Sequence, residues 1–175
     1  MPTTWILLRG LVREQAHWNG FADRLAGALG AGHRVMCMDL PGNGLRYRDR
    51  SPTRIAARED LARRGADGPI HLVALSLGGM VAMEWLRRYP REVAAAALIN
   101  SSAAPVSPFW HRLIPTNYGA IVRHGLLGRD RLKRERLILE ITTNRLADAD
   151  KDRIARQFQK IDEARPVSAA NTVRQ

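Results

Sequence analysis

Hydrophobic positions in the first hundred residues follow two alternating patterns. Short apolar runs closed by turn-forming residues are typical of buried strands in a parallel sheet. Between them, apolar residues recur every three or four positions, which is the spacing of an amphipathic helix. The predicted strands are 5–8, 35–40, a run of five residues from Ile70, and 93–99. The predicted helices are 18–29, 51–64 and 80–90.

The run 93–99, VAAAALI, fits either a helix or a strand. Alanine favours a helix by intrinsic propensity, but the short spacing after Tyr89-Pro90 favours a strand, and we predict a strand. Strands that alternate with helices at this spacing are joined by right-handed crossovers. The sequence therefore predicts an α/β fold, with a parallel sheet of four strands and helices on both faces.

The alternation stops after residue 104, and the remaining chain has helical or irregular patterns. Further helices are predicted at 132–141 and around a stripe of Ile154, Phe158 and Ile161. Ser168 is suited to cap a last short helix. We therefore expect two parts, with residues 1–104 as the α/β part and residues 105–175 as a helical segment.

The turn 74–79 follows a predicted strand, precedes a predicted helix and has the pattern small-x-Ser-x-small. A serine on a sharp turn of this kind adopts a strained backbone conformation that raises its hydroxyl above the sheet. Small neighbours relieve the crowding, and here they are Ala74, Gly78 and Gly79. An isolated match is common by chance, but its place between strand and helix makes Ser76 a candidate nucleophile.

The formal net charge of +11 is the unusual feature of the composition. Such a charge is compatible with nucleic acid, an acidic carrier protein or an anionic membrane as a partner. The basic residues are mostly arginines scattered along the chain, and the densest stretch, 129–136, also contains Asp130 and Glu135. We interpret this stretch as a solvated helix face. Nucleic acid is therefore not expected as a partner, whereas an acidic carrier protein stays open.

With 175 residues, of which 45% are hydrophobic, the chain is long enough for one domain with its own core. No apolar run reaches the length of a membrane span, and the run 5–8 lacks the features of a signal peptide. We therefore expect a soluble cytoplasmic protein without a membrane partner. The five histidines have no paired metal-ligand spacing, so neither a metal nor another cofactor is expected.

Four segments in the order of the chain resemble motifs of the α/β-hydrolase family. Residues 9–11, Arg-Gly-Leu, resemble its His-Gly-x oxyanion loop, with arginine in place of histidine. Residues 39–44 resemble its D-x-P-G-x-G turn, 74–79 its nucleophile elbow, and Tyr89-Pro90 the segment before its next strand. Within the family, the chain is similar to small carboxylesterases such as the pimeloyl-acyl-carrier methyl ester esterases.

The resemblance implies acyl transfer, with Ser76 as the nucleophile and the backbone amides of Leu11 and Leu77 as oxyanion donors. The expected substrate is a small-molecule ester. The resemblance also implies that residues 105–175 form a helical cap over the active site. Apolar cap residues are then candidates for an acyl pocket, although packing of the cap onto the core explains them equally well. These candidates are Leu137, Ile138 and Ile141.

In the family, the catalytic acid and histidine follow later strands, so we expect both beyond Gln175. Some relatives carry the acid after the sixth strand of the family's sheet, but here that place is Asn100-Ser101-Ser102, without a carboxylate. His71 is expected at the wrong end of the sheet, and His111 and His124 fall in the predicted cap, so none is placed as the base. The sequence therefore predicts an incomplete hydrolase.

Two functions of different classes follow from these residues. The first is a serine hydrolase of carboxylic esters that is active only with the missing Asp and His, with a thioesterase or a carbon–carbon bond hydrolase of the same fold as alternatives. Ser76 argues against dehalogenases and epoxide hydrolases, which have a carboxylate at the elbow. The second function is a non-catalytic basic binding module.

Overall fold

The computed structural model describes residues 3–52, 69–102, 117, 119, 123 and 130–174. The chain divides into two compact units, one of residues 1–102 together with 165–175, and the other of residues 103–164. Residues 165–175, which the sequence grouped with the helical segment, thus belong to the unit that contains the sheet. Apart from Ser51 and Pro52, the predicted helix at 51–64 lies outside the described residues.

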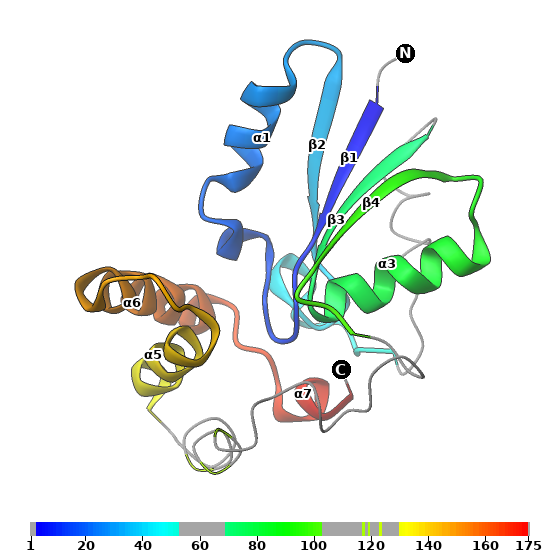
Figure 1. Cartoon of the computed structure of the whole chain (residues 1–175). Coiled ribbons are helices and arrows are strands. Elements are labelled where there is room, and N and C mark those ends of the chain that lie inside the picture. The colour runs from blue at the N-terminus through cyan, green and yellow to red at the C-terminus, as the bar shows by residue number, and fades with distance from the viewer. Residues whose placement is uncertain are drawn as a thin grey trace. The chain divides into compact units, whose positions relative to one another are not determined.

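The first unit is built on a parallel sheet (Figure 1). Its described strands are β1 (Thr3–Leu8), β2 (His33–Met38), β3 (Ile70–Leu75) and β4 (Val93–Ile99), in the order β2-β1-β3-β4. The predicted α/β class is confirmed, and so is the strand at 93–99. β4 pairs with β3 along its length, up to Leu75 beside Ile99. This pairing overrides the helical propensity of its alanines, because strand formation depends on neighbouring strands more than on intrinsic preference.

The direction of the chain's crossovers reverses between β1 and β3. From β1 the chain crosses outward to β2, whereas from β3 it crosses to β4 on the opposite side. The loops that follow β1 and β3 therefore diverge at the carboxyl ends of the two central strands. Open α/β sheets bind their ligands at such a point. Residues 9–12 and Ser76 occupy it in this fold.

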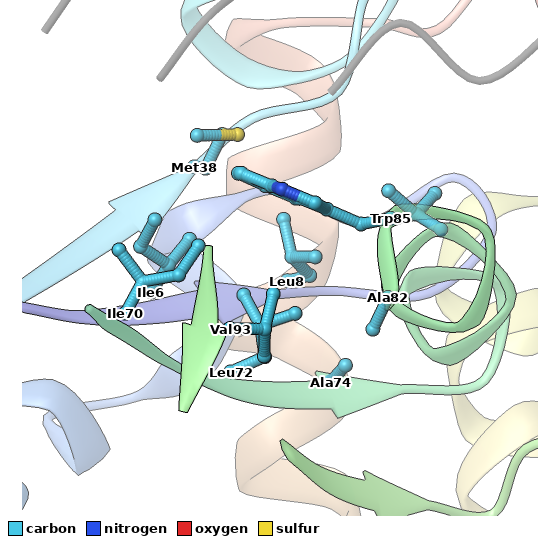
Figure 2. Packing of buried hydrophobic residues seen from close by; sticks show 10 residues of the cluster. Ile6, Leu8, Met38, Ile70, Leu72, Ala74, Ala82, Trp85 and Val93 are labelled. Atoms are coloured by element: carbon cyan, nitrogen blue, oxygen red, sulfur yellow. The ribbon is translucent and has the colours of Figure 1, made fainter. Parts of the chain in front are cut away.

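Helices cover both faces of the sheet (Figure 1). On one face, α3 (Leu77–Arg88) packs through Ala82 and Trp85 against side chains of β1, β3 and β4, and Figure 2 shows this cluster. On the other face, α1 (Phe21–Leu29) packs against Leu7 and Val73. Leu7 belongs to one cluster and its neighbours in β1 to the other, because successive side chains of a strand point to opposite faces.

The predicted helix over 18–29 is wrong in its first turn. Trp18 ends a 3-10 helix, η1 (Gln15–Trp18), and α1 begins only at Phe21. Between them, Asn19 and Gly20 have φ values of 48° and 73°, in the left-handed region that interrupts a helix. The spacing suggested one helix because Trp18 still packs against Phe21, with ring centroids 5.3 Å apart.

β4 is the edge of the described sheet beside β3, and it is open to solvent. Val93 is its only buried residue, and the six residues from Ala94 to Ile99 are exposed. The exposed fractions of Leu98 and Ile99 are 42% and 38%. Because neighbouring residues of a strand face opposite sides, both faces of β4 are uncovered beyond Val93.

The last residues of the chain are tied to the loop after β2. Ser168 accepts a hydrogen bond from the Asn171 amide at 3.1 Å, as predicted for a cap, and begins α7 (Ala169–Arg174). The buried Asn171 side chain accepts from the Ser51 amide at 2.9 Å and donates to the Asp49 carbonyl at 3.0 Å. These bonds explain why residues 165–175 belong with the sheet.

In the second unit, α5 (Arg131–Thr142) and α6 (Asp148–Ala164) pack as a pair. Their contact is made by Leu139, Ala155 and Phe158, and the predicted stripe of α6 is confirmed because Ile154 and Ile161 pack on the same cluster. An ion pair between Arg134 and Asp162, at 2.7 Å, joins the two helices. Among the described residues, no helix combines the length and apolarity needed to cross a membrane.

Candidate active site

Ser76 lies at the junction between β3 and α3, at the carboxyl end of the strand. Its φ and ψ are 54° and −117°, a region that non-glycine residues rarely adopt, so the predicted strained backbone conformation is confirmed. A non-glycine residue in such a region carries about 1–3 kcal/mol of strain, which persists only where the surroundings enforce it. The strained serine between strand and helix is the geometry that places a nucleophilic hydroxyl above the sheet.

Two glycines make the sharp turn after Ser76 possible. A Cβ atom on Gly78 would lie 2.5 Å from the Leu8 carbonyl oxygen, and one on Gly79 would lie 1.8 Å from the Ser101 Oγ. Both distances are below any real carbon contact, so neither position accepts a side chain without a shift of its surroundings. The small residues predicted at the turn are therefore required by close packing against β1 and the segment after β4.

The loop after β1 lies against the nucleophile. A Cβ atom on Gly10 would be 3.1 Å from the Ser76 Cβ, so a larger residue would require a small shift of its neighbour. The Arg13 amide donates to the Gly10 carbonyl at 3.2 Å, and Val12 has a φ of 56°, so the loop is a tight turn. Leu11 is 47% exposed at its tip. The structure thus brings residues 9–12 and Ser76 together.

The backbone amides of Leu11 and Leu77 come from the two segments that meet at Ser76. Leu77 is the first residue of α3, where an amide has no partner within the helix and the helix dipole favours negative charge. Within the described residues, neither amide donates a hydrogen bond. Both are therefore available to an oxyanion, and their role stays a prediction.

Asp39 fixes the loops around the site, a function that the sequence did not reveal. Its buried carboxylate accepts from the Gln15 amide at 2.7 Å, the Gln15 Nε2 at 2.9 Å and the Leu45 amide at 3.0 Å. A Cβ atom on Gly44 would lie 2.2 Å from this carboxylate, so the turn at 39–44 needs glycine there. The motif marked the turn but not its partner Gln15, which is distant in sequence.

His17 is a buried histidine that no sequence motif marks. Its Nδ1 accepts from the Glu14 amide at 3.2 Å, and its Nε2 lies 3.2 Å from a guanidinium nitrogen of Arg13. Burial, followed by the charges of Arg13 and Arg9, lowers the pKa of His17 to about 3. A side chain that stays neutral to such low pH is a weak general base.

No base is assembled at Ser76 by the described residues. In residues 3–52, 69–102 and 130–174, neither a histidine nor a carboxylate hydrogen bonds to the Ser76 hydroxyl. His71 lies in β3 beside Trp5, with ring centroids 4.5 Å apart, near the opposite end of the strand. His111 and His124 lie outside the described residues.

The structure places one of the three predicted acyl-pocket residues at a described cavity. Leu137 lines a cavity of about 490 Å³ on α5 and α6, whereas Ile138 and Ile141 are not among its lining residues. The rest of its wall is mostly charged, formed by Leu132, Lys133, Arg136, Glu140, Asp152 and Arg156. An acyl-pocket role for all three residues stays a prediction.

Comparisons with known proteins find relatives in sequence and in structure. A 2-hydroxy-6-oxononadienedioate/2-hydroxy-6-oxononatrienedioate hydrolase of Pseudomonas putida is 28% identical over 114 residues, which cover 61% of this chain and 39% of the relative. A thioesterase from the prodiginine pathway of Streptomyces coelicolor has a TM-score of 0.55 and 22% identity, over 99% of this chain and 59% of its own. A carboxylesterase of Nitrososphaera gargenis has a TM-score of 0.68 and 18% identity, over 99% of this chain and 62% of its own.

At these identities, the two structures are evidence for the fold alone. The chain spans less than two thirds of the length of each of the three relatives. The model of the alpha/beta hydrolase family, in contrast, matches residues 5–173, which is nearly the whole chain. On this match, and with the strained serine after β3, the chain belongs to the alpha/beta hydrolase family.

Proposed function

We propose that this chain is the nucleophile-bearing part of a serine hydrolase that acts on small-molecule carboxylic esters. In the reaction, the Ser76 Oγ attacks the ester carbonyl carbon while its proton passes to a base. The base gives this proton to the alcohol as it leaves, and an acyl-enzyme forms at Ser76. Water then attacks the acyl carbon while the base takes a water proton and returns it to the Ser76 Oγ, which releases the acid. The Leu11 and Leu77 amides stabilise the oxyanion of each tetrahedral intermediate, each by roughly 3 kcal/mol.

The positive φ of Ser76 is the observation that supports this proposal most directly. Ordinary serines at helix N-termini have extended backbones and cap the helix with their side chain, whereas the Ser76 side chain makes no capping hydrogen bond. The strain is maintained by close packing at Gly10, Gly78 and Gly79. A fold that holds a serine in this way leaves its hydroxyl free for chemistry.

We further propose that the catalytic acid and base come from residues outside this chain. The described residues provide no base at Ser76, and the chain covers 59% and 62% of the two structures it resembles. Without a triad partner, a serine hydrolase keeps only the roughly 10³- to 10⁴-fold rate advantage over water that the oxyanion hole and substrate binding provide. Residues 1–175 alone are then nearly inactive.

The test compares turnover of p-nitrophenyl butyrate by residues 1–175 and by a longer protein that adds two strands carrying an Asp and a His. We expect activity only in the longer protein and its loss in Ser76→Ala. Ser102→Ala is the matched control, because the side chain of this nearby serine makes no hydrogen bond within the described residues. Strong turnover by residues 1–175, abolished by His111→Ala or His124→Ala, would show instead that the base lies within the chain.

Two related chemistries use the same nucleophile. A thioester or an activated carbon–carbon bond also presents a carbonyl carbon to Ser76 and forms an acyl-enzyme. The geometry of Ser76 and Gly10 does not distinguish these substrates from esters. Parallel assays of the longer protein with a butyryl thioester and p-nitrophenyl butyrate measure the preference directly.

A basic binding module is the second candidate, and the net charge of +11 favours it. It would bind an acidic carrier protein through arginines rather than act on a substrate. Such binding weakens steeply with salt concentration, whereas acylation of Ser76 by an uncharged reagent does not. Measuring both at low and at high NaCl concentration separates the two functions.

A further inference from the structure

Arg9 is a partly buried cation in the loop that contacts Ser76, and the described residues give it no counter-charge. It follows β1 directly and precedes Gly10, the residue against Ser76. Its guanidinium carbon lies 4.9 Å from the centre of the Trp18 ring. Its Nε is buried and has no acceptor within the described part of the chain. Because an unpaired buried charge is costly, the position calls for an anion.

A second unpaired donor lies beside the first. The indole Nε1 of Trp18 is also buried and has no acceptor among the described residues. Guanidinium and indole nitrogens donate hydrogen bonds and do not accept them, so Arg9 and Trp18 cannot satisfy each other. A carboxylate has two oxygens with several acceptor positions and matches a guanidinium well. One carboxylate is therefore a suitable partner for both groups.

Two buried carboxylates of the described residues, Glu14 and Asp39, already have other partners. Glu14 accepts from the Arg165 Nε at 2.7 Å and from a second nitrogen of the same guanidinium. Asp39 accepts three hydrogen bonds from Gln15 and Leu45. Burial and the charge of Arg13 lower the pKa of Arg9 to about 10, so it is still protonated at neutral pH. The local field is positive and attracts an anion from outside.

The location of this cation links it to Ser76. Arg9 and Ser76 follow the central strands β1 and β3, where the diverging loops mark the ligand site of an open sheet. A ligand group bound by Arg9 would lie at the same edge of the sheet as an ester carbonyl at Ser76. We propose that Arg9 and the indole N–H of Trp18 bind a carboxylate of the substrate, so that the preferred esters are half-esters of short dicarboxylic acids. This inference rests on the proposed function of Ser76.

Binding of monomethyl glutarate tests the proposal without turnover. In residues 1–175 observed by ¹H–¹⁵N NMR, we expect saturable shifts of both the Trp18 indole and the Leu77 amide resonances. Trp18→Phe assigns the indole signal. Dimethyl glutarate, which has no carboxylate, should bind at least tenfold more weakly. Equal binding of the half-ester and the diester would overturn the proposal.

Arg9→Gln should weaken half-ester binding at least tenfold, and Arg9→Lys should weaken it less because the charge remains. Arg34→Gln is the matched control, since this exposed arginine of β2 loses the same charge. A circular dichroism spectrum confirms that each variant is folded. Undiminished binding by Arg9→Gln contradicts the proposal.

Inorganic phosphate distinguishes a substrate site from a free-anion site. If phosphate shifts the Trp18 indole signal but the half-ester does not shift the Leu77 amide signal, the substrate assignment is wrong. Ser76→Ala should bind the half-ester as the wild-type chain does, because the anion contacts do not involve its hydroxyl. A lack of esterase turnover and a lack of half-ester binding are therefore measured independently of each other.

Discussion

The Oγ of Ser101 occupies the space that a side chain on Gly79 would need, since it lies 1.8 Å from the point that a Cβ atom on this glycine would take. The same hydroxyl donates to the Ser76 carbonyl at 3.1 Å. The Ser76 amide in turn donates to the Ile99 carbonyl at 2.9 Å. The segment after β4 is therefore in direct contact with the turn that strains the nucleophile, and the two should respond together to mutation.

Gly79→Ala should destabilise the chain by about 1–3 kcal/mol, because the added methyl group overpacks a closed contact. Ser101→Gly in the same chain should restore part of this loss by removing both the hydroxyl and the Cβ atom from the contact. Urea unfolding of the two single variants and the double variant measures the coupling. Additive effects would show that the two residues are not in contact.

The matched control is Gly27→Ala in α1. A Cβ atom there would meet nothing within 4 Å, and Gly27 is exposed in the middle of the helix. Alanine should therefore stabilise the chain, by roughly 0.5–1 kcal/mol. Opposite signs for the two glycine substitutions would locate the effect of Gly79→Ala in packing.

Asn171→Ala should loosen the C-terminal residues from the loop after β2. The substitution removes the acceptor of the Ser51 amide and the donor to the Asp49 carbonyl, both in a buried place. Loss of buried hydrogen-bond partners costs about 1–3 kcal/mol. Asn144→Ala, at an exposed position, is the control. Equal unfolding midpoints for the two variants would contradict the observed network.

The sequence was sufficient for the sheet and the nucleophile because both depend on local patterns. Apolar runs of strand length end at turn residues, and the small residues around Ser76 mark a strand-to-helix turn. Even the alanine-rich β4 was predicted, because the chain between Pro90 and Val93 is too short to start another layer.

Features that depend on tertiary contacts were not visible in the sequence. Helical spacing included Trp18 with α1, although Asn19 and Gly20 turn the chain between them. Asp39 and Gln15 are joined only in the folded chain, and so are Arg9 and Trp18. In α5, the sequence shows three apolar residues, Leu137, Ile138 and Ile141, but does not show which of them line a cavity. The periodic pattern of a sequence identifies the apolar face of a helix. The residues that contact this face are determined by tertiary packing.

Ala96→Lys should reduce self-association of residues 1–175. β4 presents an open edge with six consecutive exposed apolar residues, which is a template for pairing with another strand. A lysine in the middle of such an edge opposes pairing by its charge. Ala28→Lys adds the same charge at an exposed position of α1 and is the control. Sedimentation velocity should show less association for Ala96→Lys than for the wild-type chain or Ala28→Lys. A purely monomeric wild-type chain would show that the β4 edge does not cause association.

Acid should destabilise the chain through His17. Its pKa is lowered from 6.5 to about 3 by burial first and then by Arg13 and Arg9, so the unfolded chain binds a proton that the folded chain excludes. The neutral histidine thus contributes stability that is complete above pH 6.5 and is lost as the pH falls from 6.5 to 3. At about pH 5 the loss should be roughly 2 kcal/mol relative to about pH 7.

His17→Gln keeps an acceptor for the Glu14 amide but cannot titrate, so its urea midpoint should fall less between these pH values. His33→Gln, at an exposed position of β2, should keep the wild-type dependence, and identical pH profiles for all three chains would refute the role of His17.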